Sequence, residues 1–144
     1  RAIYEHLTRH GYDCFLDTEN IDSGSFRSII TQQIQTRAHF VVALTKNALV
    51  RCTEPGDFLR YEIELALEQK RNIVPLLFEG FTFSAAQEYL TGHLKLLPNY
   101  NGVTIPVDYF EEAMTRLRER FLCRLPEDVL HPNESSYNTE EHEE

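Results

Sequence analysis

Cysteine is scarce in this chain, and tryptophan is absent. The three cysteines, Cys14, Cys52 and Cys123, are odd in number and widely spaced. That pattern excludes a disulfide framework and a cysteine metal site. Since thiols stay reduced in the cytosol, it indicates a reducing, cytoplasmic setting.

Positive charge is also scarce. The chain carries 14 lysines and arginines against 23 aspartates and glutamates, a net charge of −9. Nucleic-acid binding depends on lysine and arginine, so this balance argues against a nucleic-acid partner. We find no apolar run long enough to cross a bilayer and no signal-peptide pattern, and expect no membrane partner. Neither standard type of glycine-rich phosphate loop is present.

The length and the apolar content suit one ordinary domain, since 144 residues with 42% hydrophobic side chains can bury a core. The composition changes near the end, where residues 133–144 are polar, acidic and without apolar periodicity. We therefore predict one domain over residues 1–123 and an acidic disordered tail or linker over residues 124–144.

Helical and strand-like patterns alternate along the chain. The predicted order is a helix ending before Gly11, a strand at 12–17, a helix at 27–37, a strand at 39–44, a helix at 58–70 capped by Asp57, a strand at 73–78, two helical turns within 84–98, a strand at 102–106 and a helix at 108–125 capped by Asp108. The apolar runs at 39–44 and 73–78 are typical of strands buried on both faces. This order predicts an α/β fold with a parallel sheet between helices. In such sheets the active crevice lies off the carboxyl ends of the strands.

The helix at 58–70 holds the main catalytic candidate. Its apolar stripe places Glu64 and Glu68 toward solvent and Glu62 at the flank of the stripe. Phe58 lies one turn before Glu62 on the same side of the helix. An aromatic ring can stack on a planar group of a ligand, and a carboxylate can accept hydrogen bonds from its hydroxyls. The pair therefore suits the wall of a binding pocket. The alternative is that Glu62 belongs to a solvated helix flank.

The other polar candidates are weaker. Asp17 ends a predicted strand, where a catalytic, metal-binding or phosphoacceptor carboxylate can stand, but the acid cluster and lysine of a receiver domain are missing. Residues 18–26 suit a loop that closes over a site, or an ordinary surface loop. Cys52 has no histidine near it in sequence to act as a base. The histidines show no metal-ligand spacing, so we expect no metal site.

Several segments taken together resemble one family. They are FLDTENIDSGSF at 15–26, LTKNAL at 44–49, DFLRYEIELALEQKRNIVPLLFEGF at 57–81, YNGV at 100–103 and YFEEAMTRLRERFL at 109–122. The chain resembles a TIR domain over about residues 1–123, in the NAD-hydrolysing branch that includes bacterial defence proteins and the animal axon-degeneration enzyme. The resemblance implies the flavodoxin-like TIR fold and cleavage of the nicotinamide–ribose bond of NAD+.

The resemblance also implies roles for individual residues. Glu62 matches the catalytic glutamate, and Phe58 matches an aromatic that is commonly tryptophan in relatives. Substrate binding is expected at Phe58, Phe26, Asp17 and Cys52. Residues 18–26 would be the mobile BB loop, which contacts other TIR copies through Ile21, Asp22, Ser23 and Gly24. NAD+ would be the substrate, with no cofactor.

At the front the chain departs from the family pattern. TIR domains open with a central strand that this chain lacks, which would leave two strands without a neighbour.

Three functions stay open. The first is a self-associating NAD+ glycohydrolase or cyclase in immune or cell-death signalling. The second is a TIR scaffold that acts only by homotypic binding. The third is another flavodoxin-like module, such as a receiver.

Overall fold

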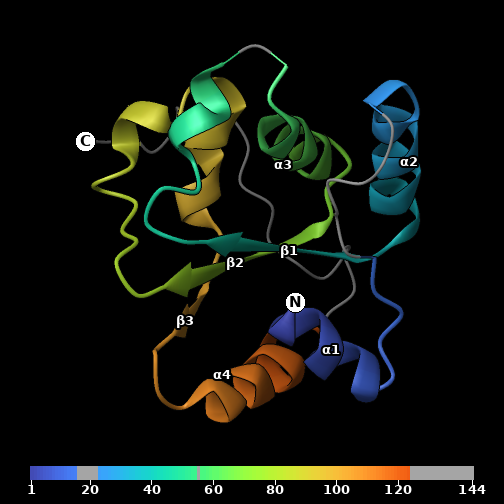
Figure 1. Ribbon diagram of the computed structural model, residues 1–144, viewed down its shortest axis with the longest axis vertical. Coiled ribbons are helices and arrows are strands. Elements are labelled where there is room, and N and C mark those ends of the chain that lie inside the picture. Colours follow the sequence, from blue (N-terminus) through green and yellow to red (C-terminus); the bar gives the residue numbers. More distant parts are fainter. Residues whose placement is uncertain (16–22, 55, 124–144) are drawn as a thin grey trace, which may run out of the picture.

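A parallel sheet forms the middle of the molecule (Figure 1). The computed structural model describes residues 1–15, 23–54 and 56–123, and for residues 23–26 it describes the backbone. The sheet has the order β1 (His39–Leu44), β2 (Asn72–Phe78) and β3 (Val103–Ile105). The register pairs His39 with Asn72 and Phe78 with Ile105.

Helices cover both faces of this sheet (Figure 1). The helices α2 (Ser23–Thr36) and α3 (Phe58–Glu68) lie on one face, with the 3-10 turns η1 (Val50–Thr53), η2 (Gln87–Tyr89) and η3 (Gly92–Asn99). The helices α1 (Ala2–Arg9) and α4 (Phe110–Arg116) lie on the other, and α4 continues into the π-helical turn η4 (Leu117–Phe121). Each face buries its own apolar cluster, one around Leu44, Ile63 and Leu97, the other around Leu76, Met114 and Leu117. The predicted α/β fold with a parallel sheet between helices is confirmed.

The central part of the chain folds where its sequence pattern predicts. The helix α3 begins after Asp57, whose carboxylate accepts a hydrogen bond from the Arg60 backbone N–H at 3.0 Å. The strand β2 is paired on both sides and buried from Asn72 to Leu76, as expected of a continuous apolar run.

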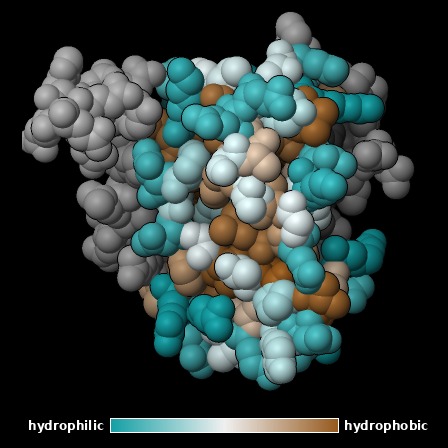
Figure 2. Space-filling model, turned by 90° about the vertical axis from the view of Figure 1, so that its left-hand side faces the viewer, coloured by the Kyte–Doolittle hydropathy of each residue, from teal (hydrophilic) through white to brown (hydrophobic). Residues whose placement is uncertain are grey.

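Figure 2 looks onto the edge of the molecule toward which the strands point and shows an apolar stripe framed by hydrophilic residues.

Two predictions about strands are wrong. Residues 12–15, predicted as the start of a strand, belong to no strand, because no neighbouring strand offers them a ladder within the described chain. The strand β1 is buried only at Val42 and Leu44, and Ala43 is exposed. It pairs with β2 on one side alone within the described residues, so its outer edge has no strand to cover it.

Two helix starts also differ from the prediction. The helix α2 begins at Ser23, four residues before the predicted start at Arg27. The last helix begins at Phe110, and its cap residue is Tyr109 in a left-handed conformation with φ of 69°, in place of Asp108. A left-handed tyrosine carries no sequence signal, because this region is rarely adopted by non-glycine residues. No helix in the part of the chain that the structure describes is long and apolar enough to cross a membrane.

Candidate active site

The first two turns of α3 hold the residues that helical periodicity selects. Phe58 is the first residue of the helix and is 38% exposed. Glu62, one turn later, is only 9% exposed, whereas Glu68 is exposed and Glu64 is partly so. The predicted contrast between Glu62 and the two solvent-facing glutamates is therefore confirmed. Burying a carboxylate costs free energy unless it is paired or hydrogen-bonded, which sets Glu62 apart from its two neighbours on the helix.

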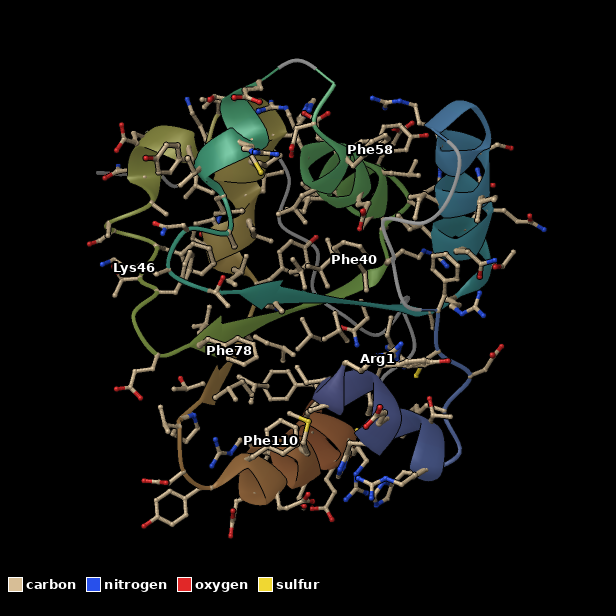
Figure 3. The ribbon with its side chains drawn as sticks, viewed as in Figure 1. Arg1, Phe40, Lys46, Phe58, Phe78 and Phe110 are labelled. Atoms are coloured by element: carbon tan, nitrogen blue, oxygen red, sulfur yellow. The ribbon has the colours of Figure 1, made fainter. Side chains whose placement is uncertain are left out.

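Glu62 lines a cavity of about 380 Å³ along the outer edge of β1, called here the β1 cavity. Its walls come from α1, α2, α3, β1, β2 and the segments that connect them, and include Leu7, Phe15, Gln33, Ile34, Phe40 and Glu62. Figure 3 shows Phe40 rising from β1 toward the layer of α2 and α3. The volume lies in the range of small-molecule sites, and a mostly apolar wall with a few polar groups is their usual composition. The cavity runs beside β1 and not off the carboxyl ends of the strands, where we expected the crevice.

Phe58 lies on the side of α3 that faces α2 (Figure 3). The guanidinium of Arg27, from α2, lies 5.3 Å from the centre of the Phe58 ring and 4.6 Å from that of Tyr61. Its Nη2 donates a hydrogen bond to the Gly56 carbonyl at 3.0 Å. Sequence reasoning missed Arg27, because no local pattern shows which residue of α2 packs against α3.

Arg60 ties the start of α3 to two distant segments. Its Nη1 donates to the Cys52 carbonyl at 2.7 Å and to the Thr91 hydroxyl at 2.6 Å. Its Nη2 donates to the Thr91 carbonyl at 3.2 Å and forms an ion pair with Glu64 at 3.0 Å. The guanidinium therefore joins η1 and the segment before η3 to the helix that carries Phe58 and Glu62.

Cys52 is fully buried, and its Sγ lies 3.7 Å from the Asp57 carboxylate. Burial, reinforced by the negative charge of Asp57, raises the pKa of the thiol to about 12. A thiol with this pKa stays protonated at neutral pH and is a poor nucleophile. Its role in substrate binding stays a prediction.

The structure describes the remaining predicted site residues only by their backbone or not at all. Asp17, Ile21 and Asp22 lie outside the described residues. The backbone of Ser23, Gly24 and Phe26 forms the first turn of α2, so this end of the predicted loop is helical. The roles predicted for these six residues stay predictions. Among the described residues, no group of three His, Cys, Asp or Glu side chains could hold a metal ion.

Comparison with known proteins identifies the family of the chain. The family described as "TIR domain" matches residues 1–118. The chain is 29% identical over 114 residues to NAD(+) hydrolase tir-1 of Caenorhabditis elegans, which covers 77% of this chain and 12% of that protein. It is 32% identical over 120 residues to NAD(+) hydrolase sarm1 of Drosophila melanogaster, covering 81% of this chain and 9% of that protein. It is 28% identical over 124 residues to NAD(+) hydrolase SARM1 of Danio rerio, covering 84% and 17% respectively. The chain thus spans less than a fifth of the length of these relatives.

Proposed function

Because this chain belongs to the TIR domain family, we propose that it is an NAD+ hydrolase that cleaves the bond between nicotinamide and ribose. The proposal is supported by the names of three similar proteins, all NAD(+) hydrolases. NAD+ is then the substrate, and no separate cofactor takes part in the reaction.

The observation that carries the proposal is the pair formed by Phe58 and Glu62. The two side chains lie one turn apart on α3, the first partly exposed and the second at the wall of the β1 cavity. Phe58 offers a ring face for stacking on a planar group such as nicotinamide. Glu62 offers a carboxylate whose partly apolar surroundings strengthen its attraction for positive charge.

This pair suits the bond that breaks. Cleavage proceeds through an oxocarbenium-like state with positive charge on the ribose, as in glycoside chemistry. Nicotinamide leaves with the bonding electron pair, and the Glu62 carboxylate stabilises the charge and accepts hydrogen bonds from the ribose hydroxyls. Water then adds to the ribosyl carbon and loses a proton, giving ADP-ribose. Capture by the adenine of the same molecule would give a cyclic isomer.

The proposal also covers further substrate contacts and the assembly of several TIR copies. Phe26, Asp17 and Cys52 are proposed to bind substrate, on the family resemblance. Ile21, Asp22, Ser23 and Gly24 are proposed to contact another TIR copy, so that self-association activates the enzyme. We propose that the protein acts in the cytoplasm, in immune or cell-death signalling.

The experiment that tests the activity follows nicotinamide and ADP-ribose by chromatography while the protein concentration is raised through the range in which light scattering detects assembly. We expect nicotinamide to appear in equal amount to the NAD+ lost, at a specific rate that rises with assembly. If assembled protein releases no nicotinamide, the alternative holds, and the domain is a scaffold that acts by homotypic binding.

A further inference from the structure

An open, polar hollow of about 410 Å³ lies where α2 meets α3, on the side of Tyr61. We call it the α2 hollow, and its lining is Arg27, Ser28, Thr31, Gln32, Gln35 and Tyr61. The five residues from α2 recur at the spacing of one helix face, so a single side of the helix forms the floor. The hollow is separate from the β1 cavity, whose lining shares none of these residues.

The chemistry of the lining suits an anion. It contains one guanidinium, three hydroxyls and two amides, and no carboxylate, although the whole chain carries a net charge of −9. The Thr31 hydroxyl already donates to the Arg27 carbonyl at 2.7 Å, and the Tyr61 hydroxyl then donates to Thr31. The Ser28 hydroxyl, the two amides and the planar fork of Arg27 N–H groups remain to donate hydrogen bonds to phosphate oxygens. A ligand with negative charge is attracted to the guanidinium and meets no carboxylate in this lining.

The guanidinium of Arg27 is held in place before any ligand arrives. It lies 5.3 Å from the centre of the Phe58 ring and 4.6 Å from that of Tyr61, and donates to the Gly56 carbonyl. The Tyr61 ring is itself fixed, because its hydroxyl lies 2.5 Å from the Thr31 hydroxyl. Groups ordered in advance lose less conformational entropy when a ligand binds, which favours affinity.

The α2 hollow and the carboxylate of Glu62 lie on either side of Phe58. At about 100° per residue, Tyr61 projects about 60° to one side of Phe58 on α3, and Glu62 about 40° to the other. Tyr61 accordingly lines the hollow, and Glu62 lines the β1 cavity. Phe58 itself lines neither region, but a ligand that stacks on its ring lies beside the two α3 residues that line them, Tyr61 and Glu62.

We propose that the α2 hollow binds the diphosphate of the dinucleotide substrate, with Arg27 as its main ligand. This inference rests on the proposed function, in which the nicotinamide ribose lies at Glu62. The diphosphate joins the two ribosides of NAD+ and carries two negative charges, so it follows the nicotinamide ribose along the ligand. Arg27 thereby sets which substrates bind, by selecting those that carry phosphate beyond the ribose.

The test compares Arg27→Gln with the parent protein. Glutamine keeps a planar, hydrogen-bonding group and removes the charge. The matched control is Arg116→Gln, because Arg116 is exposed on α4, on the opposite face of the sheet. Thermal unfolding of all three proteins confirms that each is folded. Because charged hydrogen bonds to phosphate are among the strong ones, we expect kcat/KM for NAD+ to fall about 10- to 100-fold in Arg27→Gln and to change less than about twofold in the control.

Phosphate-free nicotinamide riboside separates charge recognition from a structural role. We expect its cleavage to be unchanged in Arg27→Gln, whereas an equal loss for riboside and NAD+ would show that Arg27 only supports the packing of Phe58 and would overturn the inference. Calorimetric titration with ADP-ribose gives a second readout that needs no turnover. Affinity that drops at least tenfold in Arg27→Gln supports the anion site even in a protein that cleaves nothing, and equal affinity in the two proteins refutes it.

Discussion

Replacing Arg60 with alanine removes the guanidinium that joins three segments at the start of α3. The side chain is 22% exposed and donates to the Cys52 carbonyl, the Thr91 hydroxyl and the Thr91 carbonyl at 2.7, 2.6 and 3.2 Å. The substitution leaves these part-buried acceptors without this donor. A fully buried acceptor left unpaired costs about 1–3 kcal/mol, and a part-buried one lies at the low end of that range. Loss of the Glu64 ion pair adds only about 0.3–0.5 kcal/mol, since helix pairs near solvent are weak.

The sum is a loss of about 3 kcal/mol in the free energy of unfolding, dominated by the two carbonyls. For a domain of this size, each kcal/mol lowers Tm by about 3–4 °C. We therefore expect Tm to fall by about 10 °C in Arg60→Ala, measured by calorimetry or by fluorescence-monitored thermal unfolding.

The matched control is Glu64→Gln, which removes the ion pair and keeps the three bonds to η1 and Thr91. We expect its Tm to fall by no more than about 2 °C. The reasoning is refuted if the two variants lower Tm equally, because the ion pair would then account for the whole effect of Arg60. It is also refuted if Arg60→Ala unfolds within about 3 °C of the parent protein.

Three further predictions concern other positions. With a thiol pKa of about 12, Cys52 should react with iodoacetamide far more slowly than the exposed Cys123, and peptide mass spectrometry that finds equal labelling of the folded protein would contradict its burial. Burial lowers the pKa of His6 in the native state, so the unfolded state binds more protons, and the free energy of unfolding should fall as the pH drops below about 6.5. Between pH 7.5 and pH 5, urea unfolding should show a smaller loss in the free energy of unfolding for His6→Gln than for the parent protein. An equal loss in the two proteins would show that His6 does not cause the pH dependence. A Cβ at position 102 would lie 2.8 Å from the Pro75 carbonyl, so Gly102→Ala should cost about 1–3 kcal/mol in urea unfolding, and unchanged stability would show that the chain relaxes there.

The parts of the fold that local patterns govern could be predicted. Residues 73–78 form a continuous apolar run, and β2 is the strand with neighbours on both sides. Asp57 stands before an apolar periodicity, and it caps α3. The same periodicity separates the buried Glu62 from the exposed Glu68, because a helix fixes the direction of every side chain relative to its core stripe.

What depends on distant neighbours could not be predicted. Residues 12–15 have a strand-like composition, but a strand exists only where another backbone supplies hydrogen bonds. The packing of Arg27 against Phe58 is set by how α2 lies on α3, which no local window contains. The left-handed backbone at Tyr109 has no compositional signal.

The family resemblance supplied what physical patterns did not. Periodicity placed Glu62 at the flank of the apolar stripe, one turn after Phe58, but only the resemblance connected it with NAD+. The roles of Asp17, Ile21 and Asp22 depend on that resemblance alone, since those residues lie outside the described chain. Cys52, to which the resemblance assigns a role in substrate binding, is fully buried, so each role that rests on the resemblance needs its own test.

The central claim is that the Glu62 carboxylate stabilises the charge that develops on the ribose of NAD+. The most direct measurement is the rate of nicotinamide release by the protein in its natural full length, compared with Glu62→Gln and with Glu64→Gln as the matched control two residues away. We predict a loss of at least about 100-fold in Glu62→Gln, as for other electrostatic groups that act on the transition state, with NAD+ binding largely kept and full activity in the control. Equal rates in the two variants, with both proteins folded, would contradict the claim and return Glu62 to a structural position on the flank of α3.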